Sequence, residues 1–311
     1  MNTLTLTQDF PGPGAVDRKP PAALAEPVTD SIKDKTMQKS SAPAVGETAT
    51  AFAETLRNLF RSALPPVLGL FLLIGIWHVA TQSGGAIPSP GTVWDAALVL
   101  FADPFYNNGP NDQGIGWNVL SSLQRVGIGF GIAALVGIPL GFMIGRFKFL
   151  SDMLNPIISL LRPVSPLAWL PIGLLVFKKA DPAATWTIFI CSIWPMIINT
   201  AVGVQRVPQD YLNVARVLAL SEWKVITKIL FPAVLPYMLT GIRLSIGTAW
   251  LVIVAAEMLT GGVGIGFWVW DEWNNLKVEH IIIAIFIIGI VGLILEQALI
   301  LLAKKLTKEA A

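Results

Sequence analysis

Residues Arg206–Pro232 read RVPQDYLNVARVLALSEWKVITKILFP, and they separate two long apolar runs. The stretch carries too many polar and charged residues to cross a bilayer, yet its apolar residues recur at helical spacing. Pro208 suits the start of one helix, and Ser221 with Glu222 suits the start of a second. We therefore predict a compact helix–turn–helix at a membrane surface, which ends where Pro232 begins the next span. Its two apolar stripes would comprise Leu212, Ala215, Leu218 and Ala219, and then Trp223, Ile226 and Leu230.

The composition points to an integral membrane protein. Of the 311 residues, 54% are hydrophobic and only 14% are charged, and the mean hydropathy is +0.64. Soluble domains typically carry about 25% charged residues. The chain has one cysteine and two histidines, which argues against a disulfide framework and against a histidine-based catalytic or zinc site.

Six segments are apolar enough to cross a bilayer, for which a helix needs roughly 20 such residues. The third contains Arg162, Pro163, Pro166 and Pro171. Irregular backbone at membrane depth is tolerated only where protein or a water-filled cavity covers it, so we expect this span inside the bundle. The prediction is an all-α integral membrane fold with spans at residues 65–82, 119–145, 153–177, 183–204, 234–258 and 280–303.

The second span is rich in glycine at four-residue spacing, which lets helix backbones approach closely. The bundle interior explains this pattern, and a subunit interface is the alternative. The pairs are Gly127/Gly131, Gly137/Gly141 and Gly141/Gly145.

Four regions are expected along the chain. Residues 1–50 lack the apolar core of a signal peptide and are rich in Pro, Ala, Thr, Ser and charge, so we predict a disordered cytoplasmic extension. Residues 51–64 predict an amphipathic helix on the membrane surface, with an ordinary soluble helix as the alternative. Residues 65–303 form the transmembrane domain, and residues 304–311 a cytoplasmic tail.

Basic residues near the helix ends set the orientation. They gather before the first span, after the second, in the 206–232 stretch and at the end of the chain, whereas the loop 83–117 has none. Both termini are therefore expected in the cytoplasm of a multi-pass plasma (inner) membrane protein, with loop 83–117 outside. Lys178 and Lys179 break this pattern; they are either tolerated on the external side or attract an anion there.

The 206–232 stretch resembles the EAA loop of ATP-binding-cassette (ABC) importer permeases. That pattern is E-A-A, three residues, G, nine residues, I, one residue, L-P. Ala215, Ile229 and Pro232 match it, whereas Asn213, Val214, Ala219 and Phe231 depart from it.

Other segments resemble the permeases of nitrate, sulfonate and taurine importers. These are Ser122–Val126 (SLQRV), Gly137–Gly141 (GIPLG) and Leu161–Pro171 (LRPVSPLAWLP). Two more, Asp103–Asp112 (DPFYNNGPND) and Trp270–Leu276 (WDEWNNL), are similar to cyanobacterial-type nitrate, bicarbonate and cyanate permeases, with nitrate the nearest.

The resemblance implies a type I ABC-importer permease bundle that moves a small oxyanion inward by alternating access. Nitrate is the expected substrate, with nitrite as a further candidate and bicarbonate, cyanate or sulfonate and taurine as alternatives. The implied partners are a second copy of the chain, two cytoplasmic ABC ATPase subunits and an external solute-binding protein. Membrane lipid surrounds the spans, and no nucleic-acid partner is expected.

The chain lacks a Gly-x-x-x-x-Gly-Lys-Ser/Thr phosphate loop. We therefore expect a transport subunit rather than an enzyme, with no cofactor or metal of its own and with ATP and Mg bound by the partner subunits. A rigid contact segment, Asn213 to Ser221, would dock on the ATPase. The predicted coupling residues are Asn213, Val214, Ala215, Arg216, Ala219, Leu220, Ser221, Glu222 and Lys224.

An anion that crosses hydrocarbon needs positive charge or hydrogen-bond donors along its path. Ionisable residues inside the spans are the natural candidates, and the alternative is that Arg–Glu pairs only hold the bundle together. Tryptophans are pore candidates or membrane anchors. The predicted path residues are Arg162, Arg243, Arg125, Ser165, Trp169 and Glu257.

Two other classes of protein fit the sequence less well. An ion-gradient-driven anion transporter would need no ATPase-docking loop and often shows inverted repeats, of which the sequence has no clear sign. A membrane enzyme is disfavoured because no cluster of His, Cys or carboxylate residues is apparent.

Overall fold

The computed structural model of the chain describes residues 45–82, 84–110 and 112–310. The described residues form helices joined by short loops and contain no β-strand. The helices are α1 (Val45–Thr81), α2 (Pro90–Leu100), α3 (Ile115–Arg146), α4 (Lys148–Leu161), α5 (Pro166–Phe177), α6 (Ala180–Gln205), α7 (Gln209–Val217), α8 (Glu222–Val225), the π-helical turn η1 (Ile226–Leu230), α9 (Phe231–Thr260), α10 (Ile265–Asn274) and α11 (Val278–Ala310).

The chain divides into a unit of residues Met1–Leu68 and a unit of residues Gly69–Ala311. Helix α1 begins in the first unit and ends in the second, so the predicted surface helix 51–64 and the first span belong to one helix. Of the predicted disordered extension, residues 1–44 lie outside the described residues.

The predicted all-α membrane fold is confirmed. Among the described residues, five helical segments are long and apolar enough to cross a membrane, and the bent pair α4–α5, taken as one span, is the sixth. The loop 83–117, predicted to lie outside, contains α2, which begins at Pro90 with the Ser89 side chain accepting a hydrogen bond from the Thr92 N–H. The prediction missed this helix because its 11 residues are too few to cross the bilayer.

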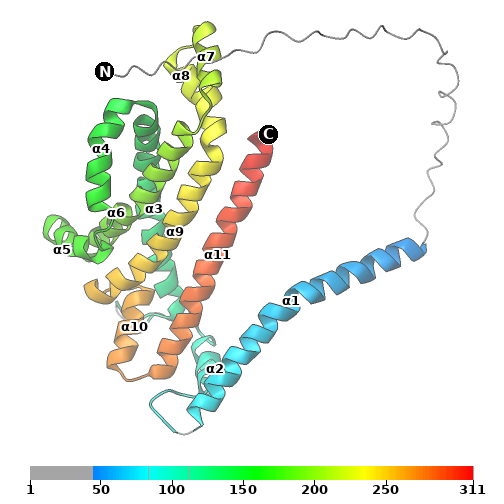
Figure 1. The fold of residues 1–311 in the computed structure, drawn as a ribbon. Coiled ribbons are helices and arrows are strands. Elements are labelled where there is room, and N and C mark those ends of the chain that lie inside the picture. Colours follow the sequence, from blue (N-terminus) through cyan, green and yellow to red (C-terminus); the bar gives the residue numbers. More distant parts are fainter. Residues whose placement is uncertain (1–44, 83, 111, 311) are drawn as a thin grey trace, which may run out of the picture. The chain divides into compact units, whose positions relative to one another are not determined.

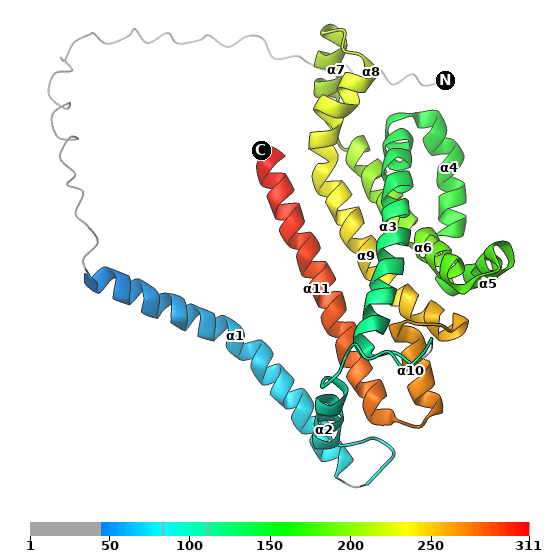
Figure 2. The ribbon, with the colours of Figure 1, turned by 180° about the vertical axis from the view of Figure 1, so that it is seen from behind.

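Helix α6 forms the centre of the unit, with α3 on one side and α9 on the other (Figures 1 and 2). It is the most enclosed span, since 61% of its apolar window is buried. Helices α3 and α6 run parallel, because Gly129 faces Ile188 and Gly145 faces Val204 in the same register.

The glycines of α3 explain this close approach. A Cβ built on Gly141 would lie 2.6 Å from the Thr200 Cβ, and one on Gly145 would lie 2.6 Å from the Val204 Cβ. The predicted pairs Gly137/Gly141 and Gly141/Gly145 therefore pack against α6. Gly127 and Gly131 face no described atom within 4 Å, so that pair plays no part in packing within the unit.

The chain returns across the membrane between α3 and α6 through a broken span. Helices α4 and α5 meet at 97°, and residues 162–165 join them. Pro163 and Pro166 lie in and beside this break, where they supply no backbone N–H for a continuous helix. Figure 1 shows α5 at one edge of the bundle, below α4 and turned away from its direction.

The expectation that this span lies inside the bundle is wrong for the single chain. Ile158 is the buried residue of α4, and Leu170 and Gly173 are the buried residues of α5. The outer faces of both helices are exposed. The break is covered by α6 and α9 on one side only, because α5 packs most closely on α6.

Candidate functional site

The predicted helix–turn–helix is present, and its first helix begins where Pro208 predicted it. Helix α7 runs Gln209–Val217, with Pro208 at the N-cap position, and Leu218–Ser221 form a turn. The contact segment expected at Asn213–Ser221 is therefore half helix and half turn. We call residues 209–221 the knob.

The inner face of the knob packs on the ends of α6 and α9. Ala215 is 1% exposed and belongs to a buried cluster with Val204 and Val234. Leu212 and Leu220 pack against the same cluster. Leu218 and Ala219, predicted to share this apolar stripe, are exposed instead, because the helix has already ended at Val217.

The turn that ends α7 is a Schellman motif. The Leu220 N–H donates to the Ala215 carbonyl and the Ala219 N–H donates to the Arg216 carbonyl, both at 3.0 Å. This pattern requires a left-handed residue after the helix, and Ala219 takes that conformation with φ +48. Glycine is the usual residue there, which gives a physical reason for the glycine of the EAA pattern.

The second helix does not stop at Pro232 as predicted. Helix α8, the π-helical turn and α9 form one continuous span, Glu222–Thr260, in which Pro232 lies in the first turn of α9. Ser221 occupies the N-cap position, but its side chain makes no capping hydrogen bond. Trp223 is 72% exposed rather than part of the apolar face, and Val225 is buried in its place.

The outer face of the knob is exposed and largely apolar. Val217 is 86% exposed, and Val214, Leu218 and Trp223 are also exposed large hydrophobic side chains. Exposed apolar side chains gathered on the knob and on the adjoining α8 favour a protein interaction site. The predicted coupling residues Asn213, Arg216, Ala219, Ser221, Glu222 and Lys224 are exposed as well, whereas Ala215 is buried and Leu220 is half-buried.

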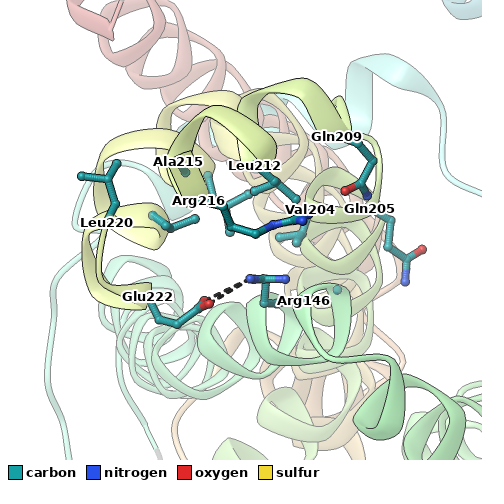
Figure 3. Close-up of a pocket in the computed structure, with 12 residues that line it drawn as sticks. Arg146, Val204, Gln205, Gln209, Leu212, Ala215, Arg216, Leu220 and Glu222 are labelled. Carbon is teal, nitrogen blue, oxygen red and sulfur yellow. Dashed lines mark hydrogen bonds and ion pairs between the residues drawn. The ribbon is translucent and has the colours of Figure 1, made fainter. Parts of the chain in front are cut away.

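A cavity of about 250 Å³ lies behind the knob, between α7, α8 and the ends of α3 and α6 (Figure 3). Arg146 Nη2 donates to Glu222 Oε1 at 3.0 Å and to Oε2 at 3.2 Å, which joins the end of α3 to the start of α8. Arg216 points into the same space (Figure 3). Arg146 Nε is buried with no hydrogen-bond partner in the described residues.

A buried polar network occupies the opposite end of the unit. Glu257, near the end of α9, is 1% exposed. Its carboxylate accepts hydrogen bonds from Arg125 Nη1 at 2.6 Å, from Ser122 Oγ at 2.7 Å and from the Gly266 N–H at 3.0 Å. Charge-assisted bonds of this kind offset the cost of burying a carboxylate.

Arg125 also reaches two other elements. Its Nη1 donates to the Val263 carbonyl at 2.7 Å, and its Nη2 lies 2.7 Å from Asp181 Oδ1 at the start of α6. Asn118 Oδ1 accepts from the Gly264 N–H at 2.9 Å. The network thus joins α3, α6 and α9 to the turn before α10.

The six predicted path residues fall into three places. Arg125 and Glu257 pair within the network, and Arg243 pairs with Glu296 of α11. Arg162 and Ser165 lie in the break between α4 and α5, and Trp169 lies on α5. The structure brings Arg162 and Trp169 to one cavity and leaves Arg243 outside it.

Sequence reasoning missed Asn118 and Asp181 as members of the network. Asn118 carries no sequence signal, and Asp181 is far in the chain from the residues it meets. Ser122 stands in the quoted SLQRV segment, although the resemblance gave it no role. In the described part of the chain, no group of three His, Cys, Asp or Glu side chains is placed to hold a metal ion.

Known proteins resemble this chain over most of its length. The family model of the binding-protein-dependent transport system inner membrane component matches residues 137–308. The nitrate import permease protein NrtB of Synechocystis sp. is 49% identical over 75% of this chain and 85% of its own length. The bicarbonate transport system permease protein CmpB of Synechocystis sp. is 44% identical over 78% and 88%.

A solved structure shares the fold. The MetNI methionine ABC transporter in an inward-facing conformation matches with a TM-score of 0.50 at 14% identity, over 62% of this chain and 94% of that chain. The ion-gradient-driven transporter weighed above has no such support. The chain belongs to the binding-protein-dependent transport system inner membrane components, and it is a permease subunit of an ABC importer.

Proposed function

We propose that this chain imports nitrate, with nitrite as a second substrate, as one half of a homodimeric permease. The observation that carries the proposal is the 49% identity to a nitrate import permease over 85% of that protein's length. Bicarbonate is the rival substrate, since a bicarbonate permease is 44% identical over a similar share.

The proposal includes an assembly and an orientation. Two ABC ATPase subunits bind ATP and Mg and dock on the knobs of the two permease copies, and an external solute-binding protein delivers the anion. Both chain termini lie in the cytoplasm of an inner-membrane protein. The exposed apolar side chains on the outer face of the knob support this docking role, because an ATPase groove would cover them.

Docking on the knob is proposed to move the spans between inward- and outward-facing states. The Arg146–Glu222 ion pair would carry the motion of the knob to α3, and the continuous helix Glu222–Thr260 would carry it to α9. Rigid elements of this kind transmit domain movements in switching proteins. The anion would pass near Arg162, Ser165 and Trp169.

The substrate assignment is tested with the reconstituted complex in proteoliposomes. The binding protein is loaded in turn with nitrate, nitrite, bicarbonate or cyanate, and both ATP hydrolysis and uptake are measured. We expect nitrate to stimulate both, nitrite to follow, and the other two to stimulate neither. Stimulation by bicarbonate without stimulation by nitrate would refute the nitrate assignment while leaving the ABC permease intact.

The docking role is tested with Arg216→Glu, which reverses a charge at the knob. We expect this variant to lose ATPase subunits during purification while the permease stays folded. Lys148→Glu is the control, because Lys148 is an exposed cation at the start of α4, outside the knob. Equal recovery of ATPase in both variants would contradict the assignment of Arg216 to the docking surface.

A further inference from the structure

A cavity of about 350 Å³ lies between α5, α6 and α9. The break after α4 contributes one wall, the middle of α6 a second, and α9 a third. Its lining includes Arg162, Trp169, Cys191, Trp194, Thr248 and Leu251.

The cavity lies near the middle of the membrane. Helix α4 starts beside the end of α3 and has 14 residues, so it rises about 21 Å before the break, against a hydrocarbon core of about 30 Å. Cys191 and Trp194 occupy the middle of the 26-residue helix α6. Irregular backbone at this depth is tolerated where it lines such a cavity.

Two residues that line the cavity carry side-chain hydrogen-bond donors with no partner among the described residues. Arg162 makes none of the ion pairs found in that part of the chain, although every other arginine that lies within a span pairs with a carboxylate. Trp169 Nε1 is buried and unpaired. A charged guanidinium and a buried N–H are both costly at membrane depth, so each calls for an acceptor.

We propose that this cavity is a mid-membrane binding site for a planar, monovalent oxyanion. The inference rests on the proposed function and specifies where the anion binds during passage. The planar guanidinium of Arg162 matches two oxygens of such an anion at once, and the indole N–H of Trp169 can donate to the third. Ser165 occupies the N-cap position of α5 at the same break, where the positive end of the helix adds to the favourable field.

A larger cavity near the outer end of α3 is a weaker candidate. It encloses about 780 Å³ and includes Arg125. That guanidinium is already held by Asp181 and Glu257, so an entering anion would face two carboxylates. Arg243 is likewise neutralised by Glu296. Arg162, which makes no ion pair, and Trp169, whose indole N–H is unpaired, both line the cavity at the break between α4 and α5.

Cys191 provides a direct reporter, because it is the single cysteine of the chain and lines the cavity. The assembled complex is treated with an anionic methanethiosulfonate, and modification of this chain is followed by intact mass. We expect nitrate to slow the reaction about tenfold relative to chloride at the same ionic strength. Leu251→Cys in a Cys191→Ser background repeats the measurement from the α9 wall.

Three variants test the roles of the donors. Arg162→Gln should abolish the protection by nitrate, and Trp169→Phe should weaken it several-fold, since phenylalanine keeps a ring but has no N–H. Arg243→Gln is the matched control and should leave protection intact. Protection that survives Arg162→Gln would overturn the proposal.

The site and the proposed substrate can fail separately. A wild-type complex that imports nitrate but shows no protection at either thiol would refute the site alone. Protection by bicarbonate, together with bicarbonate import and no nitrate import, would support the site and refute the nitrate assignment.

Discussion

Ala219 holds a strained position that a single substitution should relieve. Its φ of +48 places it in the left-handed region, where the Cβ of an L-residue costs roughly 1–2 kcal/mol. Glycine avoids this cost but loses more conformational entropy on folding, by about 0.4–1 kcal/mol. Ala219→Gly should therefore stabilise the turn by about 0.5–1 kcal/mol.

Amide hydrogen exchange measures the stabilisation by Ala219→Gly at the turn itself. The Leu220 N–H donates to the Ala215 carbonyl and exchanges only when the Schellman turn opens. A stabilisation of about 0.5–1 kcal/mol predicts that its exchange slows by about two- to fivefold. The same chemical change at Ala215, which lies inside α7 and is buried, should act in the opposite direction, because glycine destabilises a helix interior by about 1 kcal/mol.

Ala219→Gly and Ala215→Gly together separate an effect of the left-handed conformation from a general effect of glycine. Unchanged or faster exchange of the Leu220 amide in Ala219→Gly would show that the left-handed conformation carries no cost at this position. Slower exchange in both Ala219→Gly and Ala215→Gly would show that a general effect of glycine, rather than the conformation of residue 219, controls the turn.

Three further substitutions test the packing, the network and the coupling. Gly141→Leu should destabilise the protein by about 3 kcal/mol or more and lower its thermal midpoint, because α3 would be pushed off α6; Gly131→Leu, which meets no described atom, should be silent. Glu257→Gln should cost about 3–5 kcal/mol in thermal unfolding, since it leaves a buried arginine without its nearest carboxylate. Glu296→Gln breaks the half-exposed ion pair with Arg243 and should cost less than about 1 kcal/mol. Equal losses of stability in Glu257→Gln and Glu296→Gln would contradict the greater weight given to the buried pair. Arg146→Gln should preserve ATP hydrolysis but lower the anions moved per ATP, and an unchanged ratio would exclude the ion pair from coupling.

Hydropathy predicted the spans well because the bilayer imposes one strong rule on composition and length. It could not predict the direction of α5. The prolines indicated a break near Arg162, but the 97° bend depends on tertiary packing. Gly173 lets α5 rest closely on α6, where a Cβ would lie 3.0 Å from Trp186 Cδ1. The sequence of residues 162–171 alone does not indicate that contact.

In the helix–turn–helix, too, local sequence indicated some features and missed others. Pro208 and Ser221 marked the two helix starts within a residue, because both residue types favour the beginning of a helix. The end of α7 was missed, since the turn uses an alanine where glycine would have signalled it. The pairing of Arg125 with Glu257 was foreseen as a possibility, whereas the share of Asn118 in the network depends on a fold that brings distant residues together.

The continuous helix Glu222–Thr260 links the ion pair at the knob, the mid-membrane cavity and the buried network of Glu257. Its 39 residues span about 58 Å, from the ion pair with Arg146 at one end to the buried Glu257 at the other. The network fixes the far end, so displacement of the knob must appear as tilt along the helix or as rearrangement of its π-helical turn, a feature often found at functional positions. Thr248 and Leu251 lie on the same helix and form the wall of the mid-membrane cavity. Tilt that begins at the knob therefore moves that wall against Arg162, which ties the release of a bound anion to the state of the ATPase.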